Sequence, residues 1–100
     1  MSRIMSDIAM SANPVARWSR EQIRAARKAP LALLLRARGL ELRELEAGNL
    51  TLPQTHSGLF LKDNYWRWPE RQLAGNTIDF FTQILGLTFH DAMLNITAGI

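Results

Sequence analysis

The chain has 100 residues, the size of one small domain, and 47% of them are hydrophobic, which is enough for a single core. It contains no cysteine, which excludes a disulfide scaffold and any cysteine-ligated metal site. The charge is uneven, because residues 1–38 carry eight basic and two acidic side chains while residues 39–100 carry four basic and seven acidic ones, so the first part is the one expected to meet phosphate groups.

Two features of the sequence predict a cytoplasmic protein without membrane contact. Residues 1–7 lack the apolar region of a signal peptide. No apolar run approaches the ~20 residues that a membrane-spanning helix needs. Residues 1–19 are expected to form a flexible or helical lead-in, and residues 20–100 the domain itself.

The first predicted helix covers residues 15–28 or 20–28, depending on which of two start signals it uses. Asn13-Pro14 is a plausible N-cap followed by proline, and Ser19 with Gln22 has the spacing of a capping box. The pattern fits one helix or two short ones. One face carries four cations: Arg20, Arg24, Arg27 and Lys28. This basic face is either solvated surface or a contact for phosphate groups.

Pro30 begins a second predicted helix, because proline suits the first turn and cannot continue the hydrogen bonds of the preceding helix. Leucines repeat there at helical spacing until Gly39, the expected C-cap. Residues 40–52 are ambiguous. Their leucines suit either a helix or two strands, with a turn signal at Gly48-Asn49 between the halves.

A β-hairpin is predicted for Leu59–Leu61 and Tyr65–Trp68, two apolar and aromatic segments joined by a tight turn. Residues 53–58 before it are predicted to be a loop. Pro69 ends the second strand because it has no N–H to donate to the ladder.

The alternation of Trp66 and Trp68 with Arg67 puts both indoles on one face of the sheet. The indoles either belong to the core or stack on nucleobases. We expect them in the core, because the helix that follows needs a sheet face to cover. Four side chains are then expected to form an outward surface for a nucleic-acid backbone: Lys62, Tyr65, Arg67 and Arg71.

Gly75 is predicted to supply a permissive backbone at a sharp turn. Asn76 and Asp79 are predicted to cap a helix that Gly86 ends. A last helix is predicted over residues 88–97. Helices at both ends of a small central antiparallel sheet make the fold α+β.

Two segments near the end of the chain resemble the zinc-binding domain of bacterial DNA primases. They are Gly75-Asn76-Thr77-Ile78-Asp79-Phe80 and Leu87-Thr88-Phe89-His90-Asp91-Ala92. In that family a Gly-Gly-Asp-Ala-Ile-Asp-Phe-like segment is followed by a helix and then by a Ser-Phe-x-Glu-Ala-like second helix. The resemblance runs back to about Ile23 and covers roughly three quarters of the chain. It implies a zinc-ribbon-like sheet, and it favours a hairpin for residues 40–52.

The family binds one zinc ion with a Cys-x-x-His pair and a later Cys-x-x-Cys pair. The resemblance puts the second pair at Trp68 and Arg71 and the first pair near Leu52 and Thr55, with His56 one residue away. None of these residues is cysteine, and one imidazole cannot make a tetrahedral site, so no metal or other cofactor is expected. Four aromatic side chains are expected to stabilise the sheet by burial instead: Phe60, Tyr65, Trp66 and Trp68.

The resemblance implies a non-catalytic DNA-binding module, a degenerate zinc finger, of a replication or mobile-element protein such as a plasmid primase-like protein. It would hold single-stranded DNA for a partner catalytic domain. The alternative is a protein-interaction domain that docks onto a primase, helicase or relaxase without contacting DNA, which an exposed apolar patch on the last two helices would favour. The sequence has no nucleophile–base pair or phosphate loop, so an enzyme is not expected. His56 and His90 are expected to be surface histidines.

Overall fold

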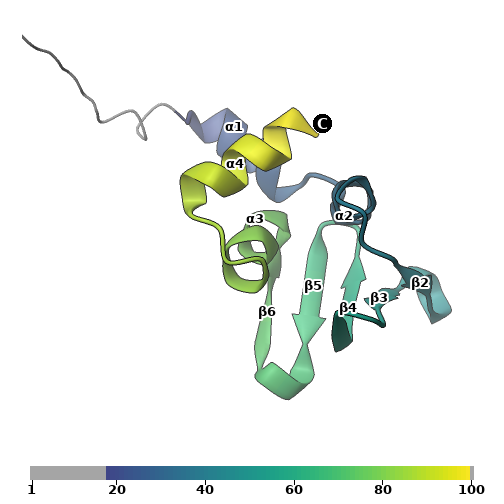
Figure 1. The fold of residues 1–100 in the computed structure, drawn as a ribbon. Coiled ribbons are helices and arrows are strands. Elements are labelled where there is room, and N and C mark those ends of the chain that lie inside the picture. The colour runs from purple at the N-terminus through teal and green to yellow at the C-terminus, as the bar shows by residue number, and fades with distance from the viewer. Residues whose placement is uncertain (1–17, 100) are drawn as a thin grey trace, which may run out of the picture.

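The sheet of this α+β fold has five strands in the order β2-β3-β4-β5-β6, and each strand is antiparallel to its neighbours (Figure 1). The computed structural model describes residues 18–99, so residues 1–17 of the predicted lead-in over residues 1–19 lie outside the described residues. The strands are β2 (Arg43–Glu44), β3 (Leu50–Leu52), β4 (His56–Lys62), β5 (Tyr65–Trp68) and β6 (Leu73–Asn76).

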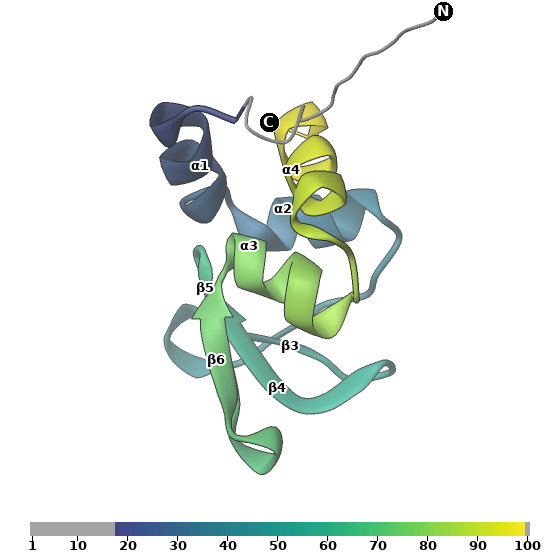
Figure 2. The same cartoon turned by 90° about the vertical axis from the view of Figure 1, so that its left-hand side faces the viewer.

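The helices lie on one side and at one end of this sheet. Figures 1 and 2 show α3 and the turn that continues it against one sheet face, with the other three helices gathered beyond the end of the strands. None of the helices within residues 18–99 is long and apolar enough to cross a bilayer. They are α1 (Arg20–Arg27), α2 (Leu31–Ala37), α3 (Thr77–Asp79) and α4 (Phe89–Ala98).

Helix α1 begins at the second of the two predicted start signals. The Oγ atom of Ser19 accepts a hydrogen bond from the Gln22 N–H at 3.0 Å, and the Gln22 side chain accepts one from the Ser19 N–H at 2.8 Å. This capping box satisfies backbone donors that have no partner within the helix. The earlier signal, Asn13-Pro14, lies outside the described residues.

The hairpin prediction for residues 40–52 is confirmed, although its first strand is short. Strand β2 covers two residues and pairs with β3, and a helical turn, η2 (Glu46–Gly48), connects them. Strand β4 begins at His56, so the predicted loop over residues 53–58 is wrong for its last three residues. The β3–β4 register shifts between Thr51 and Leu52, and Leu52 then pairs with His56, which brings the second half of the expected loop into the sheet.

Strand β6 was not predicted, and the role predicted for Gly75 is wrong. Gly75 lies within β6, where it pairs with Trp66, and the chain turns earlier, at Gln72, whose φ is 57°. A Cβ atom on Gly75 would lie 2.5 Å from both Cβ and Oδ2 of Asp79. Glycine is therefore required here by the close approach of the Asp79 side chain, which accepts a hydrogen bond from the Asn76 N–H at 3.0 Å.

The helix after Asn76 changes its pitch, which the sequence pattern did not predict. Helix α3 continues as a wider turn, η4 (Phe80–Ile84), in which the Leu85 N–H donates to the Phe80 carbonyl, five residues back, at 3.1 Å. Both Phe80 and Phe81 are thereby buried. Phe80 meets Trp66 edge to face, with the ring centroids 5.7 Å apart and the planes at 88°.

Candidate nucleic-acid interface

The two faces of the β4–β5 hairpin differ sharply in burial. Leu59 and Leu61 of β4 and Trp66 of β5 are buried in the core, which confirms the core prediction for Trp66. Because side chains alternate along a strand, the residues between them point away from the core. We call these four residues the outer sheet face: Phe60, Lys62, Tyr65 and Arg67, all of them exposed.

Each aromatic residue of the outer sheet face lies opposite a cation. Phe60 pairs with Arg67 and Lys62 pairs with Tyr65 across the two strands. The exposed fraction is 40% for Phe60 and 53% for Tyr65, so the prediction that these two rings stabilise the sheet by burial is wrong. An exposed ring can stack on a base while a neighbouring cation neutralises a phosphate.

Phe60 was missed as a candidate contact residue. The signal for it is present in the sequence, because a residue between Leu59 and Leu61 must point outward if both leucines point inward. The outward orientation predicted for Tyr65 and Arg67 agrees with their exposure. Lys62, which borders the β4–β5 turn, is exposed as well.

The structure places Arg71 away from the other three residues of the predicted surface. Its guanidinium carbon lies 4.6 Å from the centroid of the Trp68 ring. Trp68 lies on the core side of the sheet, where it is half-buried, and its Nε1–H donates to the Ser57 carbonyl at 3.1 Å. Arg71 therefore packs on the face opposite to Arg67 and does not contribute to the outer sheet face.

Three of the four positions at which the primase resemblance puts zinc ligands, Leu52, Trp68 and Arg71, are linked through His56, the residue after the fourth position, Thr55. Leu52 pairs with His56 in the sheet, the rings of His56 and Trp68 are 5.5 Å apart, and Arg71 covers the Trp68 ring. Within residues 18–99 no group of three His, Asp or Glu side chains could hold a metal ion. Contacts between side chains connect these segments; we call His56, Trp68 and Arg71 the Trp68 cluster.

Both histidines are half-buried, so they are less exposed than we expected. His56 is the first residue of β4, and its Nδ1 lies 2.8 Å from the Thr55 Oγ1. His90 lies in the first turn of α4, as predicted, and its Nδ1 accepts a hydrogen bond from the Trp18 Nε1–H at 3.1 Å. His90 thus connects the chain before α1 to α4.

The environment of His56 predicts a stability that depends on pH. Burial and, second, the charge of Arg71 lower the pKa of His56 below its ordinary value of 6.5. The unfolded chain therefore takes up this proton at a higher pH than the folded chain does, so stability is expected to fall as the pH drops below about 6.5. When the free energy of unfolding in urea is measured at about pH 7.5 and at about pH 5.5, it should decrease less for His56→Gln than for the parent chain.

Arg71→Gln provides a second variant for this measurement. It removes the charge of Arg71, the smaller of the two causes that lower the pKa of His56, and leaves the burial. The loss of unfolding free energy at low pH should therefore be only partly reduced. An unchanged loss of stability in His56→Gln would show that other groups are responsible for it.

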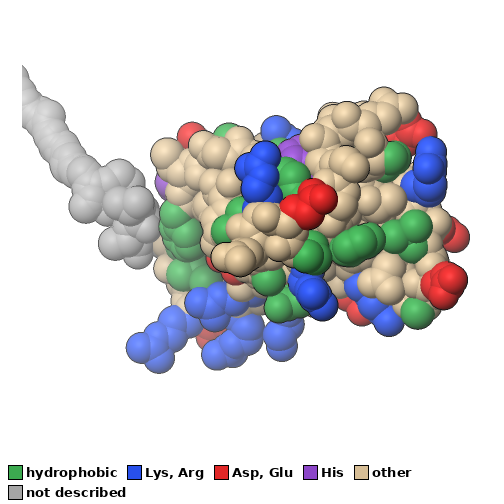
Figure 3. Space-filling view, turned by 90° about the horizontal axis from the view of Figure 1, so that it is seen from below, with side chains coloured by type: hydrophobic (Ala, Val, Ile, Leu, Met, Phe, Trp, Pro, Cys, Tyr) green, Lys and Arg blue, Asp and Glu red, His purple; other side chains and the backbone are tan. Residues whose placement is uncertain are grey.

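Four basic residues lie near one end of the outer sheet face: Arg20, Arg24 and Arg27 of α1, and Lys28, the residue after it. All four are exposed, and Figure 3 shows a group of blue side chains along the edge beside the grey trace. The Nδ2 atom of Asn64, in the β4–β5 turn, donates to the Arg27 carbonyl at 2.9 Å. The Leu31 N–H donates to the Asp63 carbonyl of the same turn at 3.1 Å. These two hydrogen bonds thus connect the β4–β5 turn, which lies between Lys62 and Tyr65, to the junction of α1 and α2.

Comparisons of the chain with protein-family models, with curated proteins and with solved structures gave no match. Its function is therefore inferred from the surface chemistry of residues 18–99. That surface combines the outer sheet face with the basic residues of α1, two regions that the β4–β5 turn connects. The combination of exposed rings and cations is typical of contacts with single-stranded nucleic acid.

Proposed function

We propose that this chain is a non-catalytic module that binds single-stranded nucleic acid, with the outer sheet face as its central contact. The alternation of two exposed aromatic side chains with two cations is the observation that supports this function best. Stacking of one base on an aromatic side chain contributes ~1–3 kcal/mol, and every base has a face that can stack. Lys62 and Arg67 are placed to neutralise the phosphates next to such bases.

A single strand fits this surface better than a duplex does. Bases in a duplex are already stacked on one another, whereas unpaired bases can lie flat on Phe60 and Tyr65. The three arginines of α1 and Lys28, which follows it, extend the basic surface beyond the β4–β5 turn. A strand can therefore run from the sheet toward α1 with cations along its backbone.

The cellular role that we propose follows from the resemblance to the primase zinc-binding domain. The chain would belong to a replication or mobile-element protein and hold single-stranded DNA for a partner catalytic domain. The contacts that link Leu52, Trp68 and Arg71 through His56 support this resemblance, because the positions of that family that match these three residues share one zinc ion.

Fluorescence anisotropy with a labelled single-stranded oligonucleotide, measured over a range of salt concentrations, tests the proposed function. The parent chain should bind, and affinity should fall as salt rises. Phe60→Ala/Tyr65→Ala should weaken binding by about tenfold or more at every salt concentration. Lys62→Ala/Arg67→Ala should reduce the slope of log affinity against log salt by about 1.4, which corresponds to two lost phosphate contacts on a single strand.

Arg71→Ala is the matched control, because it removes an arginine close in sequence that packs on the opposite face of the sheet. It should leave both affinity and salt slope close to those of the parent chain. Circular dichroism of each variant confirms that the fold is retained. Failure of the parent chain to bind even at low salt, where electrostatic contacts are strongest, would refute the proposal.

A second candidate function is the protein-interaction domain, and the exposed apolar residues of the helices favour it. Leu33 of α2 is 63% exposed, and Phe89 and Leu94 of α4 are 41% and 47% exposed. These residues would contact a primase, helicase or relaxase. Binding of such a partner that Leu33→Ser/Leu94→Ser abolishes, together with no binding of oligonucleotides, would favour this second function.

A further inference from the structure

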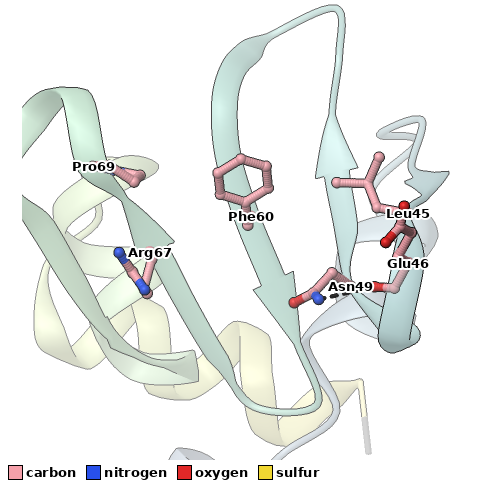
Figure 4. Close-up of a pocket in the computed structure, with 6 residues that line it drawn as sticks. All are labelled: Leu45, Glu46, Asn49, Phe60, Arg67 and Pro69. Carbon is pink, nitrogen blue, oxygen red and sulfur yellow. Dashed lines mark hydrogen bonds between the residues drawn. The ribbon is translucent and has the colours of Figure 1, made fainter.

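A pocket of about 530 Å³ opens beside the outer sheet face. One wall comes from the β2–β3 turn, the middle from β4 and the other wall from β5 and the residue after it, as Figure 4 shows. Six residues line the pocket: Leu45, Glu46, Asn49, Phe60, Arg67 and Pro69. The outer sheet face therefore continues into a hollow of a size that suits a nucleobase.

The two sides of this pocket differ in the charge and hydrogen-bonding character of their polar groups. Figure 4 shows Phe60 in the middle, with Arg67 on one side and Glu46 and Asn49 on the other. A cation thus lies across an exposed ring from a carboxylate and an amide. A flat apolar ligand that carries negative charge at one end and hydrogen-bond donors at the other matches this arrangement.

The wall formed by the β2–β3 turn is held in place by its own hydrogen bonds. The Asn49 Nδ2 donates to the Glu46 carbonyl at 2.9 Å, and the Leu45 N–H donates to the Asn49 carbonyl at 2.7 Å. Because the Asn49 amide nitrogen is used in this way, its Oδ1 atom is turned toward the pocket (Figure 4). The ionised Glu46 carboxylate is an acceptor only. This side of the pocket therefore offers acceptors to a ligand that has donors.

We propose that this pocket binds a guanine base of the single strand, an inference that rests on the proposed function. Guanine presents two adjacent donors, N1–H and N2–H, which match the two oxygens of the Glu46 carboxylate. Its ring stacks on Phe60, and its phosphate lies toward Arg67, away from the negative charge of Glu46.

The other bases match the carboxylate less well. Thymine and uracil place a single N–H between two carbonyl oxygens, which the Glu46 oxygens would repel. Adenine and cytosine offer an amino group beside a ring nitrogen that is itself an acceptor. Each of these bases therefore makes at most one favourable hydrogen bond to Glu46, whereas guanine makes two.

The inference is tested with two labelled strands of equal length, one of thymidines only and one with a single central guanosine. The parent chain should bind the strand with guanosine about tenfold more tightly, since a good bidentate contact contributes ~1–3 kcal/mol. Glu46→Gln keeps the shape of the side chain but not the pair of acceptors. It should abolish this preference by weakening binding to the guanosine strand, whereas binding to the thymidine strand should not weaken, because the carboxylate that repels the thymine carbonyl oxygens is gone.

Glu44→Gln is the matched control, because it removes the same charge from β2, in the same hairpin, at a residue that does not line the pocket. It should retain the preference for guanosine. If the parent chain binds both strands equally, or if Glu46→Gln retains the preference, the guanine inference is wrong and the proposed function still stands. If neither strand binds, the proposed function itself fails.

Competition with guanosine monophosphate separates a base within a strand from a free nucleotide. The strand also contacts Tyr65 and Lys62, so the mononucleotide should displace it only at concentrations at least a hundredfold above the dissociation constant of the strand. Displacement at an equal concentration would overturn the assignment to a base within a strand.

Discussion

Trp66→Ala is expected to lower the free energy of unfolding by about 3–5 kcal/mol, because the indole is fully buried. Removal of the ring leaves a cavity against Phe80, because the centroids of the two rings are 5.7 Å apart in the parent chain. It also removes the Nε1–H that donates to the Asn76 carbonyl at 2.8 Å. Urea unfolding followed by circular dichroism measures the change.

Two further variants make the Trp66 result interpretable. Trp66→Phe keeps a ring against Phe80 but lacks the N–H, so it should lose less stability than Trp66→Ala and remain folded. Tyr65→Ala, on the exposed side of the same strand, should change the free energy of unfolding by less than about 1 kcal/mol. Equal losses in Tyr65→Ala and Trp66→Ala would contradict the two-faced hairpin.

Gly75→Ala is expected to lower the free energy of unfolding by about 2–3 kcal/mol, although it adds a single methyl group. The new Cβ would lie 2.5 Å from Cβ and Oδ2 of Asp79, so the aspartate must move. Its movement breaks the capping box in which the Asp79 N–H donates to the Asn76 Oδ1 at 3.1 Å and the Asn76 N–H donates to Asp79.

A double-mutant cycle tests this mechanism. Asp79→Ala alone removes the capping carboxylate and should lower the free energy of unfolding by about 1 kcal/mol. Since Gly75→Ala already displaces that carboxylate, the loss in the double variant should be smaller than the sum of the two single losses. Additive losses would show that Gly75 acts independently of Asp79.

Local chemistry predicts the parts of this fold that depend on neighbours in sequence. Ser19 with Gln22 gives the start of α1, Gly39 adopts the left-handed conformation after α2, and Pro69 ends β5. Each outcome follows from hydrogen bonds or φ angles within a few residues. Such signals remain valid whatever the rest of the chain does.

The parts that were missed depend on pairing and packing with other elements rather than on the propensities of their own residues. Strand β6 includes Gly75 and Asn76, two poor strand formers, and exists because β5 offers it an edge with which to pair. The wide turn after α3 begins at Phe80, whose ring packs edge to face against Trp66 of β5. Tertiary packing overrides local propensity in both cases.

The candidate site was predicted only in part, for the same reason. Alternation along β5 indicated that Tyr65 and Arg67 point outward, whereas the expectation that large rings are buried hid Phe60. The pocket could not be predicted, because Glu46 and Asn49 reach Phe60 only after β2 and β3 have been added to the sheet. Its members lie in three separate parts of the chain.

The fastening of the β4–β5 turn to the junction of α1 and α2 fixes the spacing between two groups of cations. Lys62 borders the turn, and Arg27 provides the carbonyl that Asn64 binds. Neither side needs to become ordered when a strand arrives, so the loss of conformational entropy falls mainly on the ligand. A flexible connection would have to lose that freedom at each binding event. If the proposed function holds, the two hydrogen bonds of the turn allow a modest number of charges to act as one preorganised surface for the nucleic-acid backbone.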